Sequence, residues 1–236
     1  MIRLPIIFIL SINILFCYYK QDPVMIALSG AYNTESYGYH TVGINPANLA
    51  FNKLTSFNFF NINLNLQNNF LTNERIRSIN GADLENIDSE NYFPKEDIVG
   101  YLGGSDVKLR TIGTFPMPML NFSSKSFSLN SNIRFISNSK FSPDILDMVL
   151  EGNEIGREYD LSIEHNNILV WELSYTKAFN IDNIGLGFTV KYLKGLLYYS
   201  LDPIQDSYIQ TTETEISSQG RYLLRQNTHG EGFAID

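Results

Sequence analysis

The chain has 236 residues, of which 13% are aromatic and 18% are charged, and so few charges are unusual for a soluble surface. This length allows one large β domain or two small domains. The net charge is −8 and the sequence contains no basic cluster, so we expect no nucleic-acid partner, because phosphate binding requires clustered Lys and Arg.

Residues 1–20 have the pattern of a signal peptide. Arg3 supplies a positive charge, and an apolar run follows from Leu4 to Phe16. The run is too short for a membrane-spanning helix, so we expect export. Phe16 stands where a lipoprotein signal needs a small residue before Cys17, which disfavours lipidation. Cys17 is the only cysteine, and we therefore expect neither a disulfide nor thiol chemistry in the exported chain.

The segment that follows, residues 21–56, contains glycine-rich turns and the start of a short helix. Asn45 can cap that helix with its side chain, Pro46 suits the first helical position, and residues 47–50 can form one turn. On local chemistry alone, this segment is an ordinary loop that ends in a short helix.

Two motifs in this segment carry a family resemblance. Gly30-Ala31-Tyr32, followed by Asn45-Pro46-Ala47-Asn48, resembles the opening of FadL-type and PorV-type outer-membrane barrels in order, spacing and position behind a leader. Asn48 stands where that family usually has Gly, and it keeps a turn-prone residue there. Residues 40–43 replace the small or acidic residues that are more usual. The resemblance implies that the segment acts as an internal hatch that closes the lumen of a barrel.

Alternation of apolar and polar residues dominates the chain beyond residue 55, which indicates strands with two unlike faces. The clearest runs are residues 60–67, 127–137, 169–179 and 184–194. Such runs are about ten residues long, the length that a tilted strand needs to cross a bilayer. The short polar connection at residues 179–183 predicts that the last two runs form a hairpin.

Two stretches, Leu71–Asp106 and Lys140–Asn167, show little alternation and several carboxylates, and we expect them to be long loops with one helical piece each. In the second, Ser142 can cap a helix that starts at Pro143 and ends near Gly152. Short turns on one side and long loops on the other are typical of outer-membrane barrels.

A soluble β-sandwich alternates equally well, with its apolar face in the core. Three features favour a membrane instead: aromatic residues lie near the strand ends, the runs are longer than usual strands, and the opposite faces carry small or amide side chains. The predicted fold class is therefore all-β, an antiparallel transmembrane β-barrel over residues 57–236. Residues 230–236 resemble the start of a further barrel strand, so the sequence predicts a barrel that is incomplete in this chain.

No catalytic or metal motif stands out. His40, His165 and His229 lack the spacing of metal ligands, and we expect no enzyme, no metal and no cofactor. Glu172 and Lys191 lie on the polar faces of the predicted hairpin, where they could pair with each other or line a pore. A structural ion pair inside the barrel explains these two residues equally well.

The expected location is the outer membrane, with membrane lipid as the surrounding partner. By the resemblance, the protein carries hydrophobic small molecules through a hatch-gated lumen. A PorV-like barrel that docks secretion-system proteins is an alternative, and a soluble exported β-domain that binds a ligand is another.

Overall fold

The computed structural model describes residues 27–28 and 31–236 of the chain. The predicted signal peptide and Gly30 of the first motif lie outside the described residues. Ten strands form one antiparallel sheet: β1 Thr55–Phe57, β2 Asn63–Asn68, β3 Val107–Pro116, β4 Phe122–Ser124, β5 Phe127–Phe141, β6 Glu158–Asp160, β7 Ile163–Ile181, β8 Ile184–Thr211, β9 Ile216–Asn227 and β10 Glu231–Ile235. The helices are η1 Ala31–Asn33, η2 Gly38–Thr41, η3 Pro46–Phe51, α3 Asn73–Ile79, α4 Lys95–Gly100 and α5 Pro143–Glu151.

The strands follow one another across the sheet in chain order. They align into six runs, namely β1 with β2, β3 with β4, β5, β6 with β7, β8, and β9 with β10, and each run pairs with the run before it. Within the described residues the first and last runs do not pair with each other, so the sheet is open. The predicted antiparallel β architecture is therefore confirmed, as a meander.

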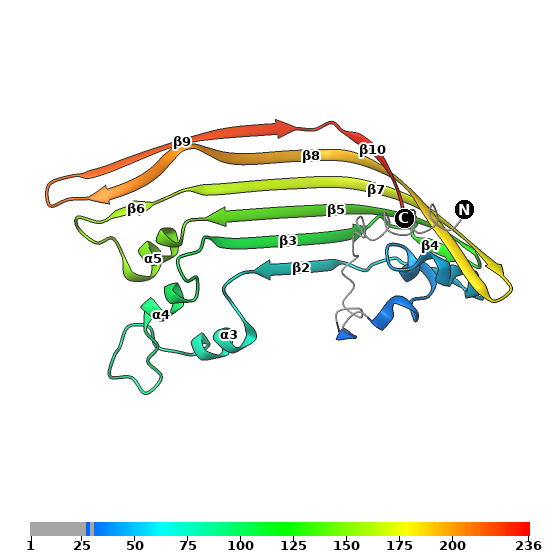
Figure 1. Cartoon of the computed structure of the whole chain (residues 1–236), viewed down its shortest axis with the longest axis horizontal. Coiled ribbons are helices and arrows are strands. Elements are labelled where there is room, and N and C mark those ends of the chain that lie inside the picture. The colour runs from blue at the N-terminus through cyan, green and yellow to red at the C-terminus, as the bar shows by residue number, and fades with distance from the viewer. Residues whose placement is uncertain (1–26, 29–30) are drawn as a thin grey trace, which may run out of the picture.

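The two ends of the sheet differ in the length of their connections (Figure 1). At one end the N-terminal helices lie beside the tight turns that join β4 to β5 and β7 to β8. Asp182 and Asn183 make the second of these turns with φ values of 50° and 70°, as a two-residue hairpin turn requires. The predicted hairpin is confirmed, with a shorter turn than residues 179–183. We call this the hatch end of the sheet.

The opposite end, which we call the loop end, carries α3, α4 and α5 (Figure 1). The helix predicted after Ser142 is confirmed, because the Ser142 side chain accepts a hydrogen bond from the Asp144 amide at 3.2 Å and the helix ends at Glu151. The predicted bounds of this loop, Lys140–Asn167, were wrong: β5 continues to Phe141, β6 spans Glu158–Asp160 and β7 begins at Ile163. Residues 137–140 and 164–167 are polar throughout although they pair in the sheet, so alternation could not locate these strand ends. The first long loop holds two helices, α3 and α4, instead of one.

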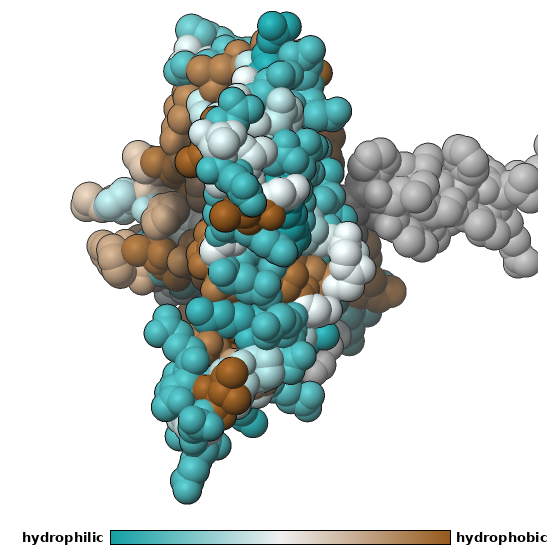
Figure 2. Space-filling view, turned by 90° about the vertical axis from the view of Figure 1, so that its left-hand side faces the viewer, coloured by the Kyte–Doolittle hydropathy of each residue, from teal (hydrophilic) through white to brown (hydrophobic). Residues whose placement is uncertain are grey.

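The two faces of the sheet have opposite chemistry. The inner face, on which the N-terminal helices lie, buries small polar side chains such as Thr176 and Thr189, both 0% exposed. The outer face exposes apolar side chains from five of the runs, namely Phe57, Leu64, Leu66, Phe115, Tyr175, Phe179, Ile181, Ile184, Leu186, Phe188, Val190, Phe233 and Ile235. Figure 2 looks at the loop end, which is largely hydrophilic, while hydrophobic atoms gather along the left margin of the sheet.

Among residues 27–28 and 31–236, no helix has both the length and the apolar character needed to cross a membrane.

Candidate functional site

The predicted short helix at Asn45 is confirmed as the 3-10 helix η3. The Asn45 side chain accepts a hydrogen bond from the Ala47 amide at 3.1 Å, and Pro46 occupies the first turn. Proline suits this position because its missing N–H would have no helical partner there. Leu49, on the buried side of the helix, is fully covered.

Asn48 ties η3 to the turn that follows η1. Its Nδ2 atom donates to the Asn33 carbonyl at 2.9 Å and to the Ser36 hydroxyl at 2.8 Å. Asn45 Nδ2 also donates to the Asn33 carbonyl, at 3.2 Å. Two side chains of the second motif thus join both halves of residues 31–52, which we call the hatch segment. A glycine at position 48 would lack these hydrogen bonds.

The hatch segment lies on the inner face where β8 carries two glycines. A Cβ atom on Gly187 would lie 2.5 Å from the Ala47 nitrogen, and one on Gly185 would lie 2.8 Å from the Ala47 carbonyl oxygen. Both distances are too short for any side chain, so the backbones of η3 and β8 approach each other directly. Glycine at these two inner positions therefore allows the hatch segment to pack on β8.

A second attachment lies near η2. Ser56 of β1 accepts a hydrogen bond from the Tyr39 amide at 3.1 Å, and its hydroxyl pairs with that of Ser123 of β4 at 2.8 Å. Gly38 has a φ of +59°, and a Cβ atom there would lie 2.3 Å from Ser56 Oγ. Glycine is thus required at position 38 both for the backbone angle and for the space.

A small cavity of about 40 Å³ lies between the hatch segment and the sheet. Its lining combines Tyr39, Val42 and Gly43 of the hatch segment with polar residues of the sheet, namely Asn63, Thr114, Asn130, Asn132, Arg134, Glu172 and Lys191, and with Asn58, Asn61 and Asn121 of the connections. Space for a water molecule requires about 10–15 Å³ and several polar partners. The cavity can therefore hold a few waters or a small polar group.

Glu172 and Lys191, the two residues that the sequence predicted for the lumen, both lie on the inner face and line this cavity. Glu172 is 7% exposed and Lys191 is 8% exposed. Each has a charged partner, because Glu172 pairs with Arg134 of the neighbouring strand β5 at 3.5 Å and Lys191 pairs with Asp236, which follows β10. Buried charges of this kind are stable only when they are paired. A role for the two residues in permeation stays a prediction.

A larger cavity of about 420 Å³ opens on the same face near the loop end. Its lining includes Lys108, Arg110, Lys140 and Glu164. Lys140 pairs with Glu164 at 3.0 Å and with Asp106 at 3.2 Å. The sequence analysis did not single out this cavity, although Lys108 and Arg110 alternate with apolar residues.

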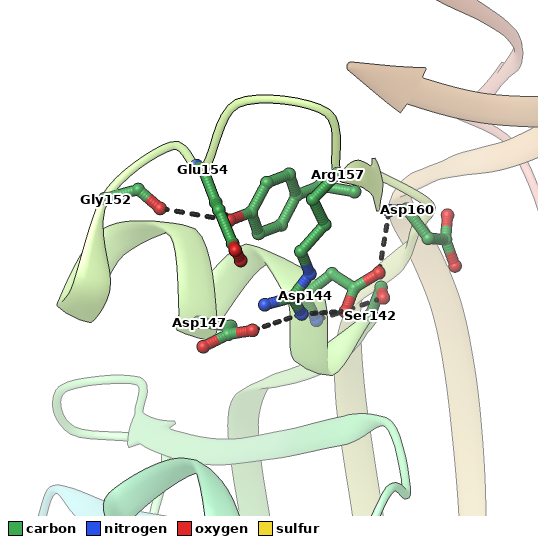
Figure 3. Close-up of polar contacts among 8 residues, drawn as sticks. Ser142, Asp144, Asp147, Gly152, Glu154, Arg157 and Asp160 are labelled. Carbon is green, nitrogen blue, oxygen red and sulfur yellow. Dashed lines mark hydrogen bonds and ion pairs between the residues drawn. The ribbon is translucent and has the colours of Figure 1, made fainter. Parts of the chain in front are cut away.

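A polar cluster stabilises the loop that carries α5 (Figure 3). Arg157 pairs with Asp147 and, at 3.2 Å, with Asp144, and its guanidinium lies over the buried ring of Tyr159. Burial alone would lower the pKa of Arg157, but its hydrogen bond to Asp147 and the nearby carboxylate charges raise that pKa. The Tyr159 hydroxyl accepts from the Glu154 amide at 3.0 Å. These contacts join α5 to the loop that follows it and to Tyr159 of β6.

None of the described residues forms a group of His, Cys, Asp and Glu that could hold a metal ion. His165 lies on β7, where its Nδ1 atom is 2.8 Å from the Ser139 hydroxyl and its Nε2 atom is 2.7 Å from Asn167. His40 lies among the rings of the hatch segment, against Tyr39. The three histidines are thus not brought together.

These features define a class of protein: an open antiparallel meander with an exposed apolar face and a polar face covered at one end by a helical segment. The chain belongs to the family of unknown function DUF5723, whose family model matches residues 46–234, from η3 into β10. No curated protein and no solved structure matches the chain. The resemblance to FadL-type and PorV-type barrels therefore stays a prediction.

Proposed function

We propose that the sheet is the wall of an outer-membrane β-barrel, and that movement of the hatch segment admits hydrophobic small molecules to its lumen. The proposal rests on the distribution of apolar and polar side chains between the two faces of the sheet, which is the reverse of that in a soluble protein. Apolar side chains cover the exposed outer face, whereas Ser, Thr, Asn and charged side chains are buried on the inner face. The sheet of a soluble protein has the opposite arrangement, with its apolar face in the core.

Lipid is the partner that suits the outer face. Leu66 is 72% exposed and Phe233 is 78% exposed, and most outer-face residues between them and the hatch end are apolar as well. A contiguous surface of this kind marks an interaction surface, and each Å² of apolar area removed from water contributes about 25 cal/mol. An antiparallel sheet also satisfies its own backbone hydrogen bonds, which the hydrocarbon interior requires. In a bilayer, the edges at β1–β2 and β9–β10 need strands that cover them.

The hatch segment is built to move as a unit. Asn45 and Asn48 make their hydrogen bonds within the segment, to Asn33 and Ser36. Its contacts with the sheet include the close packing on Gly185 and Gly187, the packing of η3 on β7 and of η2 on β1, β4 and β5, and the hydrogen bond to Ser56. A ligand that binds better when these wall contacts are broken would shift the segment towards an open state.

The alternative is a barrel that docks secretion-system proteins and carries no small molecule. The cavity of about 40 Å³ favours it, because pockets for small-molecule ligands usually measure about 300–1,000 Å³. Transport therefore requires that the hatch segment move, whereas docking does not.

One experiment separates these functions. The chain and a variant in which a Gly-Ser linker replaces residues 31–52 are reconstituted in phosphatidylcholine vesicles, which are washed with alkaline carbonate. For a hatch-gated barrel, we expect both proteins to stay in the membrane. The vesicles with the wild-type protein should take up a labelled hydrocarbon, and only the vesicles with the variant should leak dye. Retention without uptake or leakage favours the docking barrel. Loss of both proteins to the aqueous wash would refute the membrane barrel.

A further inference from the structure

On β2, β5, β7, β8 and β10, the outer face changes from an apolar to a polar residue at positions that lie along a slanted line on the side of the loop end. The last apolar outer-face residue before a polar one is Leu66 in β2, Phe135 in β5, Leu169 in β7, Tyr192 in β8 and Phe233 in β10. The polar residues that follow them are Asn68, Ser137, Asn167, Lys194 and Glu231. The line thus runs from β2 to β10, but β3 has no such change, and the apolar outer-face residues Leu109 of β3 and Leu197, Tyr199 and Leu201 of β8 lie on its loop side.

The strand register gives the slope of this line. Leu66 lies opposite Thr111, Thr111 opposite Ser137, and Ser137 opposite Asn167 of β7. At the other edge, Phe233 lies opposite Tyr192, and Tyr192 opposite Leu173 of β7. From the edge at β2 to the edge at β10, the line therefore moves from the level of Asn167 to the level of Leu173, which is six residues along the strands.

This slope equals the tilt of strands in a membrane barrel. Six residues cover about 20 Å along the strands, and the five steps from β2 to β10 cover about 24 Å across them. A line with this slope makes an angle of about 40° with the direction perpendicular to the strands. Outer-membrane strands tilt by about 35–45° from the membrane normal. When the strands are tilted by this angle in a bilayer, the slanted line therefore runs parallel to the membrane surface.

The height of the apolar band agrees with the same tilt. On β7 the line passes close to Trp171, and the outer face stays predominantly apolar from there to Ile181 at the hatch-end turn. These ten steps cover about 33 Å along the strand, or about 25 Å along a normal tilted by 40°. That is the height of the apolar band of outer-membrane barrels, about 25 Å.

The apolar band contains one positively charged side chain, Lys177, whose position is compatible with a lipid environment. Lys177 lies on the outer face of β7, and its Nζ atom donates to the Ser126 hydroxyl at 3.0 Å. Ser126 lies in the turn between β4 and β5, at the hatch end. The long stem of Lys177 thus crosses apolar surface while its charge reaches the margin, as lysines near an interface do.

We infer that the slanted line is the interface between hydrocarbon and headgroups in the leaflet on the loop side, with Trp171 and Tyr192 at headgroup depth. This inference rests on the proposed membrane barrel. The indole nitrogen of Trp171 donates to Ser131 at 2.7 Å, and its ring packs edge-on against Tyr192. Short turns of such barrels face the periplasm and long loops face outward, so the loop end with α3, α4 and α5 lies outside the cell.

The chain carries its own probe of depth, because Trp171 is its only tryptophan. Its fluorescence is measured in phosphatidylcholine vesicles whose acyl chains carry bromine near the headgroup, halfway along, or near the bilayer centre. We expect the bromine near the headgroup to quench Trp171 most. In a Trp171→Phe background, Phe188→Trp should be quenched most by the bromine near the bilayer centre, because residue 188 lies midway between Ile184 and Tyr192. Leu224→Trp in the same background should be unaffected, although Leu224 is apolar and exposed, because it lies beyond the line.

The outcomes distinguish this inference from the function on which it rests. Quenching of Trp171 mainly by the bromine at the bilayer centre, or strong quenching of the Leu224→Trp variant, would overturn the assigned interface and leave the membrane barrel standing. Absence of quenching in all three proteins would overturn both. The Leu224→Trp variant is a sharp control, because apolar character alone would place it in the bilayer.

Discussion

Gly187 of β8 lies so close to Pro46 of η3 that a Cβ atom on Gly187 would be 2.4 Å from the Pro46 carbonyl carbon. The contact joins two segments that are far apart in the sequence, and it is made by backbone on both sides. It is the place where the hatch segment and the sheet are in direct backbone contact.

Replacement of Gly187 by alanine should push η3 off the wall. Overpacking of this kind costs about 1–3 kcal/mol, and we expect faster hydrogen exchange at the η3 amides, with β7 and β8 unchanged. Gly232→Ala is the matched control, because a Cβ atom there meets no atom within 4 Å. Equal exchange in the two variants would show that the close approach does not hold the segment.

Asn48→Ala should loosen the hatch segment from within. The change removes the hydrogen bonds of Asn48 to Asn33 and Ser36, each worth about 1 kcal/mol. We expect cleavage of residues 31–52 by a non-specific protease to quicken several-fold. Asn52→Ala serves as the comparison, because Asn52 Nδ2 bonds only to the neighbouring Leu54 carbonyl, at 2.9 Å. If Asn52→Ala were cleaved as fast, the interaction between the two motifs would be unimportant.

Glu172→Gln should destabilise the folded sheet, because it weakens a buried ion pair with Arg134. Loss of one partner of a charged hydrogen-bonded pair costs about 1–3 kcal/mol. Urea unfolding in detergent, followed by Trp171 fluorescence, measures the change. The double variant Glu172→Gln with Arg134→Met should recover part of the loss, since it removes the partner charge as well. Strictly additive losses would mean that the two residues are not coupled.

Glu151→Gln should stabilise the α5 loop near neutral pH and have no effect in acid. Partial burial and the negative charges of Asp147 and Glu96 raise the pKa of Glu151 in the folded chain. A raised carboxyl pKa means that the folded state favours the protonated form, so stability is lost as the pH rises through that pKa. The neutral amide avoids this loss. Hydrogen exchange at the α5 amides should therefore be slower in the variant at pH 7, and equal to the wild type below about pH 4; a difference that persists in acid would point to another cause.

The sequence predicted the elements whose signals are local. Alternation located the β7–β8 hairpin, and the pairs Asn45-Pro46 and Ser142-Pro143 located two helix starts, because capping depends on neighbouring residues only. The predicted strand at residues 60–67 begins only at Asn63, since residues 58–62 leave the ladder between β1 and β2. β9 was not singled out, because its alternation is interrupted by Gly220 and by consecutive apolar residues at Leu223 and Leu224.

The contacts of the candidate site could not be predicted from the sequence, because they join residues on different strands. Glu172 and Lys191 could be assigned to an inner face, but their partners Arg134 and Asp236 follow from the register of β5 and β10. Gly185 and Gly187 appeared in the sequence only as part of a polar strand face. Their close approach to η3 became visible when the chain was folded, because it joins residues separated by most of the sheet.

The sequential order of the strands has a consequence for how the protein is made. Because each run pairs with the run before it, the sheet can assemble one hairpin at a time, and the largest loop that must close is the one between β2 and β3. The cost of loop closure rises with the logarithm of loop length, so no step carries a large entropic barrier. Sheets built from neighbouring segments fold faster than those that join distant ones. For the proposed membrane barrel, whose apolar strands would be exposed to water before they enter the bilayer, such speed would shorten the time available for aggregation.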